Sequence, residues 1–164
     1  MIKFTKQECD EIINLSKVLE KHERDEYPRA ISYDFYSIGW NEDSKWIFDR
    51  LDDYFTDTTG IKVIKSLDAV HLFDYSVGDR FLRHSDIYYP NQIHNIGVCL
   101  NDDYEGGDFV LYQPEYRVLP KTTGEIYTFK HSYEHEVLEV TKGHRWSLIG
   151  FYFYEHLDLK KPLL

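Results

Sequence analysis

The sequence has little of several residue types, and each shortage excludes a class of protein. Its 164 residues include only two cysteines, Cys9 and Cys99, which lie in segments typical of a helix and a strand and are predicted to be reduced, buried thiols. No apolar run approaches the ~20 residues that a membrane span requires. Basic residues are outnumbered 29 to 19 by acidic ones, and a net charge of −10 repels nucleic-acid phosphates. The N-terminal residues lack the apolar stretch of a signal peptide, which predicts a cytoplasmic protein.

Aromatic residues are abundant by contrast. They make up 16% of the chain and include 14 tyrosines, which suit strands and hydrogen-bonded pockets. The length is that of one domain, long enough to bury a core without disulfides. These features favour a strand-rich protein with a hydrated cavity.

The first 60 residues are typical of two helices. Thr5 and Glu8 have the spacing of a capping box, and the apolar stripe that follows has helical spacing: Cys9, Ile12, Ile13, Ser16 and Leu19. The charged stretch 21–26 is predicted to end this helix, and Tyr27 followed by Pro28 breaks it. A second helix is predicted at about 43–58, with Gly60 at its C-terminal stop.

From residue 61 onward, short apolar runs alternate with turn signals, which predicts strands. The predicted strands are 69–75, 81–86, 93–100, 109–113, 117–119, 125–129, 135–140 and 146–154. Eight short strands after a helical start indicate a mainly β antiparallel sandwich or jelly roll with the N-terminal helices packed on one sheet. We expect a single domain over residues 1–164, with helical support at about 1–60 and a β core at about 61–155.

One short motif is typical of metal binding. His84 and Asp86 are two residues apart, so in a strand both side chains point to the same face. One imidazole and one carboxylate are two thirds of the facial triad that holds non-haem Fe(II) and leaves positions open. Alone the motif is weak, because a surface histidine beside a solvated aspartate has the same spacing.

The third ligand must come from elsewhere in the chain. His135 is the best candidate, because it begins the penultimate predicted strand, and the second and seventh strands of a jelly roll can meet at the barrel mouth. His131 and His144, in predicted loops, remain alternatives. The remaining histidines fit this role less well: His22, His71, His94 and His156.

Arg145 opens the last predicted strand, and Ser147 lies two residues on, on the same face. A guanidinium can bind a carboxylate through two hydrogen bonds, and an arginine buried in a barrel needs an anion, which an organic acid could supply. The alternative is a solvated arginine at a strand end, or one paired with Glu134 or Glu136.

The order of these residues is informative beyond each motif. The sequence contains Tyr75-x-x-Gly78-x-x-Phe81-x-x-His84-x-Asp86, then Leu100-Asn101-x-x-Tyr104-Glu105-Gly106-Gly107, then Gly124-x-x-x-x-Phe129, then His135-x-Val137-x-x-Val140-x-x-Gly143-x-Arg145-x-Ser147. This pattern resembles the prolyl-4-hydroxylase-like branch of the Fe(II)- and 2-oxoglutarate-dependent dioxygenases, over about half of the chain.

The resemblance implies a double-stranded β-helix, with His84, Asp86 and His135 as Fe(II) ligands. It implies that Arg145 holds the distal carboxylate of 2-oxoglutarate, with Ser147 beside it and Tyr75 lining the pocket. Many relatives carry a tyrosine where this chain has Cys99, and Tyr127, on the strand before His135, is the expected substitute. O2 is the implied second cosubstrate and ascorbate a stimulant.

The implied activity is hydroxylation of an unactivated C–H bond, coupled to decarboxylation of 2-oxoglutarate. We expect a peptide or protein substrate and a peptidyl-proline target, because the tyrosine-rich stretches 27–36 and 87–92 suit an extended proline-rich chain. The net charge favours a basic peptide. The alternatives are an oxygenase of a free amino acid or other small molecule, or a non-catalytic metal-binding jelly roll. No nucleic-acid or membrane partner is expected.

Overall fold

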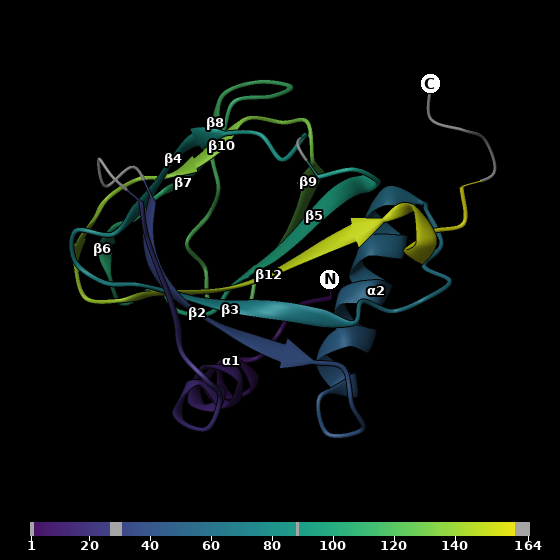
Figure 1. Cartoon of the computed structure of the whole chain (residues 1–164), viewed down its shortest axis with the longest axis horizontal. Helices are drawn as coiled ribbons and strands as arrows, with labels where there is room; N and C mark the ends of the chain where they lie inside the picture. The colour runs from purple at the N-terminus through teal and green to yellow at the C-terminus, as the bar shows by residue number, and fades with distance from the viewer. Residues whose placement is uncertain (1, 27–30, 88, 160–164) are drawn as a thin grey trace.

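A curled antiparallel sheet carries two helices on its outer side (Figure 1). The computed structural model describes residues 2–26, 31–87 and 89–159. The helices are α1 (Lys6–Asn14) and α2 (Lys45–Thr59), and short 3₁₀ turns cover Leu15–Lys17 and Tyr154–His156. The strands are β1 (His22–Glu26), β2 (Ile31–Gly39), β3 (Ala69–Tyr75), β4 (Arg80–His84), β5 (Gln92–Cys99), β6 (Glu105–Gly106), β7 (Phe109–Leu111), β8 (Arg117–Val118), β9 (Ile126–Lys130), β10 (His135–Val137), β11 (Val140–Lys142) and β12 (Arg145–Phe153).

The strand order places segments far apart in sequence side by side. The large sheet runs β8-β7-β10-β4-β2-β3-β12-β5-β9, with β1 paired to β2, and β11 pairs with β6 separately. Strand β4 therefore lies between β10 and β2, and β12 lies between β3 and β5. This order brings the predicted ligand strands into direct contact.

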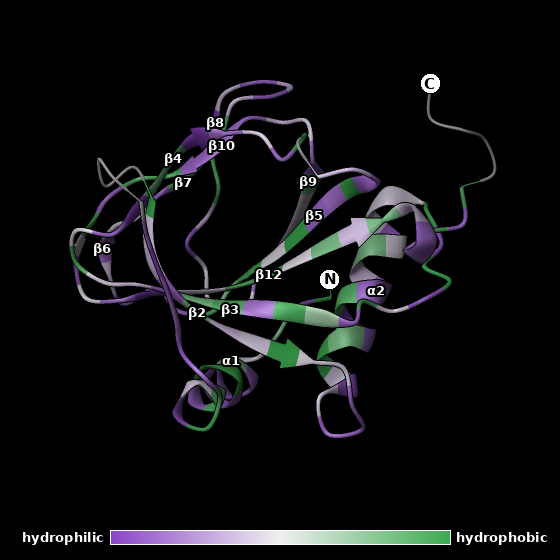
Figure 2. Ribbon diagram, in the orientation of Figure 1, coloured by the Kyte–Doolittle hydropathy of each residue, from purple (hydrophilic) through white to green (hydrophobic). Residues whose placement is uncertain are grey.

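The two faces of the sheet bury different sets of residues. Alternate side chains of β2, β3, β5 and β12 point outward and join Cys9 and Ile12 of α1 and four apolar residues of α2 (Ile47, Phe48, Leu51 and Phe55) in the main core. The inward side chains form a smaller aromatic cluster, which includes Tyr33, Tyr75, Phe109 and Phe129. Figure 2 shows apolar and polar residues side by side on both helices, as expected for helices with one buried face.

Both predicted helices are present, and the start of α1 and the end of α2 follow the expected rules. Thr5 and Glu8 form the predicted capping box. Gly60 ends α2 in the left-handed region at φ 71°, which glycine adopts without steric penalty. The prediction of a mainly β fold with N-terminal helices packed on one sheet face is confirmed. Within the described residues, no helix is both long and apolar enough to cross a membrane.

The prediction for residues 21–26 is wrong. This stretch does not end a helix: α1 ends at Asn14, and His22–Glu26 forms strand β1, in which every residue pairs with β2. A charged composition does not prevent a strand when a neighbouring strand satisfies its backbone groups. The predicted helix break at Tyr27 and Pro28 lies outside the described residues.

The strand boundaries also differ in three places that bear on the site. Strand β4 ends at His84, so Asp86 lies just beyond it. The predicted strand 135–140 is two short strands, β10 and β11, and the register shifts where β10 pairs with β4. The predicted strand 146–154 begins one residue earlier, at Arg145.

Candidate metal centre and its cavity

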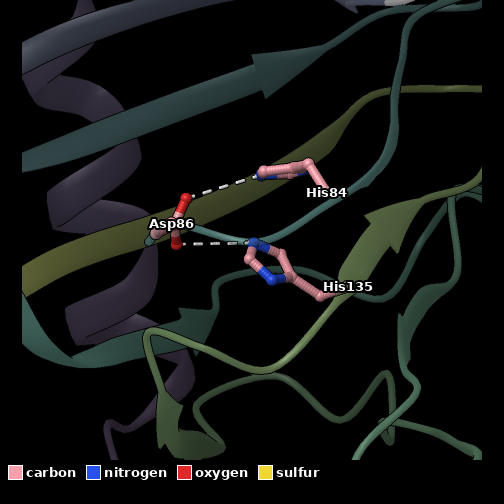
Figure 3. A group of neighbouring side chains, drawn as sticks. All are labelled: His84, Asp86 and His135. Carbon is pink, nitrogen blue, oxygen red and sulfur yellow. Dashed lines mark ion pairs between the residues drawn. The ribbon is translucent and has the colours of Figure 1, made fainter. Parts of the chain in front are cut away.

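Three predicted ligands meet at one end of the curled sheet (Figure 3). His84 and His135 are register partners across the β4–β10 pair, and their ring centroids are 4.2 Å apart. Asp86 faces both rings. One carboxylate oxygen lies 3.7 Å from His84 Nε2 and the other lies 3.7 Å from His135 Nε2. The donor atoms all lie within 4.8 Å of one another, close enough to share one ion.

Backbone carbonyls orient both imidazoles. His84 Nδ1 lies 2.7 Å from the Leu82 carbonyl oxygen, and His135 Nδ1 lies 2.9 Å from the Tyr133 carbonyl oxygen. A carbonyl only accepts, so each Nδ1 must carry the proton and donate it. The neutral rings therefore have their lone pairs on Nε2, the atoms that face Asp86. This is the arrangement that orients metal-binding histidines.

Burial keeps these imidazoles neutral. Burial and, second to it, the neighbouring His135 together lower the pKa of His84 to about 4. Burial also lowers the pKa of His135, against the opposing influence of the Tyr133 carbonyl and of Asp86. Both rings are thus unprotonated at neutral pH, as metal ligation requires.

Asp86 is held by a buried amide pair that sequence reasoning missed. Asn95 Nδ2 donates to Asp86 Oδ2 at 2.6 Å, and Gln92 Nε2 donates to Asn95 Oδ1 at 2.5 Å. Asn95 is only 1% exposed, in a strand whose residues are nearly all buried. An amide side chain directly before the apolar run Ile96–Cys99 is a signal that could have indicated it, because a buried amide needs partners.

Arg145 lines the same cavity as the three candidate ligands and is only 5% exposed. Its Nη1 donates to Ser147 Oγ at 3.0 Å, and its guanidinium carbon lies 5.3 Å from the centroid of the Tyr75 ring. Within the described part of the chain it has no ion-pair partner. Its Nε has no hydrogen-bond partner. The predicted alternatives are wrong, since Glu134 pairs with Arg83 and Glu136 accepts from Tyr112.

Tyr127 reaches toward Arg145 across a glycine. Gly97 and Tyr127 are partners on β5 and β9, and a Cβ at Gly97 would lie 2.4 Å from the Tyr127 ring. Among the residues that the structure describes, the buried Tyr127 hydroxyl has no hydrogen-bond partner, and burial raises its pKa to about 12 against the opposing charge of Arg145. The Cys99 thiol instead donates to the Asn101 carbonyl at 3.2 Å. Both cysteines are free and buried, as predicted.

A cavity of about 290 Å³ connects the triad with Arg145. Its inner end also contains Tyr75 and Ser147. Aromatic and aliphatic side chains form most of its outer wall: Ile31, Tyr33, Phe73, Phe81, Tyr89, Ile149 and Phe151. The prediction that Tyr36 faces a substrate groove is wrong, because it packs in the outer core against Trp146. Residues 27–30 and 88 of the two tyrosine-rich stretches lie outside the described residues.

The other histidines take different partners. His131 Nδ1 lies 2.9 Å from the Ile93 carbonyl, and His144 Nδ1 lies 2.8 Å from Asp74. His22 stacks on Phe35, and His71 Nδ1 lies 3.0 Å from Ser37 Oγ. Neither predicted alternative, His131 nor His144, belongs to the group around Asp86.

A second group, formed by Asp68, Glu155 and His156, also meets the distance condition for a metal site. Its histidine is oriented differently. The Phe153 backbone N–H donates to His156 Nδ1 at 3.0 Å, so the neutral ring carries its proton on Nε2. Lys65 already lies 3.5 Å from Asp68 and 4.0 Å from Glu155. The geometry therefore favours an ion pair here over a metal site.

Comparison with known proteins identifies the family. Residues 70–153, just over half of the chain, match the 2OG-Fe(II) oxygenase superfamily. The chain therefore belongs to this superfamily of 2-oxoglutarate-dependent dioxygenases, whose cofactor is Fe(II) and whose cosubstrates are 2-oxoglutarate and O2. No curated protein matches the chain.

Solved structures share the fold at low sequence identity. An oxidoreductase of the 2OG-Fe(II) oxygenase family from Burkholderia pseudomallei has a TM-score of 0.76 at 18% identity, over 94% of this chain and 82% of that one. A Pseudomonas putida prolyl-4-hydroxylase has a TM-score of 0.70 at 16% identity, over 90% and 84%. A viral collagen prolyl hydroxylase from Paramecium bursaria Chlorella virus-1, in complex with 2-oxoglutarate, has a TM-score of 0.66 at 16% identity, over 90% of each chain. These matches confirm the predicted jelly roll, or double-stranded β-helix.

Proposed function

We propose that His84, Asp86 and His135 bind Fe(II), and that Arg145 binds the distal carboxylate of 2-oxoglutarate. The observation that carries this proposal is one cavity with two prepared ends. At one end, two imidazoles with free Nε2 lone pairs face a carboxylate. At the other end lies a buried guanidinium without an ion-pair partner in the described residues.

The ligand set fits Fe(II). Two neutral imidazoles and one carboxylate are typical of a non-haem Fe(II) site that keeps coordination positions open. Bound Fe(II), with 2-oxoglutarate and O2, supplies oxidation of an unactivated C–H bond, with succinate and CO2 as co-products. The amide of Asn95 holds Asp86 in position by donating to the oxygen that faces His135.

The opposite end fits a dicarboxylate. An anion beside Arg145 would satisfy the Nε donor and the Tyr127 hydroxyl, which otherwise remain unpaired in the buried interior. Ser147 already orients the guanidinium, and Tyr75 and Phe109 cover its faces. We assign 2-oxoglutarate binding to Arg145, Ser147, Tyr75 and Tyr127, and we expect ascorbate to stimulate turnover.

For the substrate we propose a peptidyl-proline. The outer wall of the cavity is mainly aromatic, and Tyr89 at its edge is 58% exposed, which suits an extended proline-rich chain. One similar structure, a prolyl hydroxylase from Trichoplax adhaerens, is a complex with a peptide of hypoxia inducible factor. The second candidate is a free amino acid or other small molecule, which the cavity volume also accommodates.

The test is succinate release from 2-oxoglutarate with added Fe(II), stimulated by each member of a panel of proline-containing peptides and free metabolites. We expect a peptide to stimulate release and to gain 16 Da on proline. Stimulation by free metabolites alone would reject the peptidyl-proline assignment. Asp86→Ala serves as the inactive control, and Asp68→Ala, which changes the same residue type in the second group, serves as the matched active control.

Two further predictions from the sequence stand as proposals. We propose that residues 1–164 act as one domain, because β2, from the first 60 residues, contributes Tyr33 to the same cavity as β4 and β12. The cytoplasmic location remains a prediction from the sequence.

A further inference from the structure

Strand β1 carries its charges on two different faces. Alternation places His22 and Arg24 on one face and Glu23 and Asp25 on the other. The first face lies against the rings of β2, because His22 stacks on Phe35 and Arg24 pairs in register with Tyr33. Glu23 pairs with Lys21 at 2.9 Å and is largely exposed. The contacts of His22 and Arg24 with β2 therefore direct these two side chains to the aromatic interior.

Arg24 lies at the wall of the cavity in a defined orientation. Its Nη1 donates to the Tyr33 hydroxyl at 3.1 Å, and its guanidinium carbon lies 5.2 Å from the centroid of the Phe81 ring. The Phe81 ring in turn lies 3.9 Å from the ring of His84, centroid to centroid. One aromatic ring therefore separates this cation from a proposed metal ligand.

The rest of the outer wall offers little other charge. Among the described residues that line the cavity, the charged side chains apart from the histidines are Arg24, Asp86 and Arg145. Asp86 and Arg145 are assigned to the metal and the cosubstrate. Arg24, which donates to Tyr33 and lies over Phe81, is the third charged side chain of this lining. A guanidinium that is half-buried and stacked on a ring binds a carboxylate with little loss of side-chain freedom.

We propose that Arg24 binds a carboxylate of the substrate and thereby selects substrates that carry an anionic group close to the oxidised carbon. This inference rests on the proposed function and extends it to substrate choice. The carboxylate could belong to an acidic side chain beside the target residue of a peptide, or to the α-carboxylate of a free amino acid. The net charge of −10 attracts basic peptides at long range, whereas Arg24 acts only on a group in contact with it. A basic peptide with one acidic residue beside the target proline therefore suits both interactions.

The test compares matched acid and amide substrates. Three pairs are used. The first two are peptides with acetylated N-termini and amidated C-termini: Gly-Glu-Pro-Gly against Gly-Gln-Pro-Gly, and Gly-Pro-Glu-Gly against Gly-Pro-Gln-Gly. The third pair is free L-proline against L-prolinamide. Succinate release gives kcat/KM for each of the six compounds. For compounds that bind without being oxidised, calorimetric titration of the protein loaded with Zn(II) and 2-oxoglutarate gives Kd. The proteins are the wild type, Arg24→Gln, Arg24→Glu and the control Arg117→Gln, an exposed arginine on β8.

We expect the wild type and Arg117→Gln to prefer one acid over its amide by roughly tenfold or more, as for hydrogen bonds to a charged partner. The preference should fall to about one in Arg24→Gln and reverse in Arg24→Glu, while 2-oxoglutarate affinity stays unchanged. The pair that shows the preference identifies the source of the carboxylate. Equal use of acid and amide by the wild type, or an unchanged preference in Arg24→Gln, would overturn the inference. If no proline peptide is used as a substrate but the wild type still prefers L-proline over L-prolinamide, the peptidyl-proline target is rejected and the role of Arg24 is retained.

Discussion

Two groups of side chains in this protein bring three imidazole and carboxylate donors within reach of one ion, but they differ in how their histidines are held. His84, Asp86 and His135 line the cavity, whereas Asp68, Glu155 and His156 lie beside Lys65 at the other end of the sheet. In the first group, backbone carbonyls accept from Nδ1 and leave Nε2 free. In the second, a backbone N–H donates to Nδ1 and leaves the proton on Nε2. Proximity of donors is therefore insufficient, and the backbone partner of each ring decides whether it can bind a metal.

The largest expected difference between the groups is the effect of removing one aspartate. We expect Asp86→Ala to lower Fe(II)-dependent succinate release by more than about a hundredfold, because loss of a ligand exceeds the ~10–100-fold effect of losing a residue that orients one. Asp68→Ala should retain wild-type turnover. Metal affinity measured by calorimetry with Mn(II) should change in parallel. Turnover that survives in Asp86→Ala would remove the assignment.

A variant of Arg145 distinguishes 2-oxoglutarate binding from metal binding. Arg145→Ala should weaken 2-oxoglutarate binding by about 10- to 100-fold, since hydrogen bonds to a charged group contribute about 1.5–3 kcal/mol. The affinity for Mn(II) without 2-oxoglutarate should stay the same. Calorimetric titration of the metal and of 2-oxoglutarate in turn measures both, and thermal unfolding checks that the variant is folded. An equal loss of both affinities would contradict the proposed division of roles.

Asn95 tests whether the orientation of Asp86 matters. We expect Asn95→Leu, which removes the donor to Asp86 Oδ2 at similar volume, to weaken Mn(II) binding by about tenfold. Thr128→Val is the matched control, because its hydroxyl donates to the Asn95 backbone carbonyl and does not contact Asp86. Unchanged Mn(II) affinity in Asn95→Leu would show that Asp86 is held by other means.

The smallest expected effect is that of mild acid on metal binding. Because the pKa of His84 is lowered to about 4, its imidazole carries no ligand-blocking proton between pH 8 and 6, and burial also shifts the protonation of His135 to a pH below that of an ordinary imidazole. Mn(II) affinity should be nearly constant over this range and fall as the pH approaches 4, where protonation competes with the metal. Calorimetry in two buffers of different ionisation enthalpy should detect almost no proton release at pH 7. A tenfold loss of Mn(II) affinity between pH 7 and pH 6 would contradict the lowered pKa values of the two histidines.

The sequence predicted the parts of the site that depend on short spacing or on motif order. Strand alternation accounts for Arg145 and Ser147 on one face of β12. The short spacing also identified His84 and Asp86, although Asp86 lies beyond the end of β4. His135 meets His84 because two strands about fifty residues apart in the sequence pair with each other. Hydrophobic periodicity does not encode that pairing, and the order of the motifs identified His135 instead. The capping box at Thr5 and the stop at Gly60 are local signals, and both were predicted correctly.

What the sequence did not predict depends on tertiary pairing. Strand β1 has a composition typical of a solvated helix end, and it is a strand because β2 satisfies its backbone groups. That error concealed Arg24, whose position at the cavity exists only once β1 lies on β2. Asn95 was missed for a related reason, since its partner Asp86 comes from a different segment of the chain.

The most direct test of the account is the anomalous X-ray signal of Mn(II) in crystals of the protein soaked with metal and 2-oxoglutarate. The account predicts one strong peak bound by His84 Nε2, His135 Nε2 and Asp86, and none between Asp68 and His156. A peak at the second group, or at the first group with an imidazole turned to coordinate through Nδ1, would contradict the claim that backbone partners select the metal site.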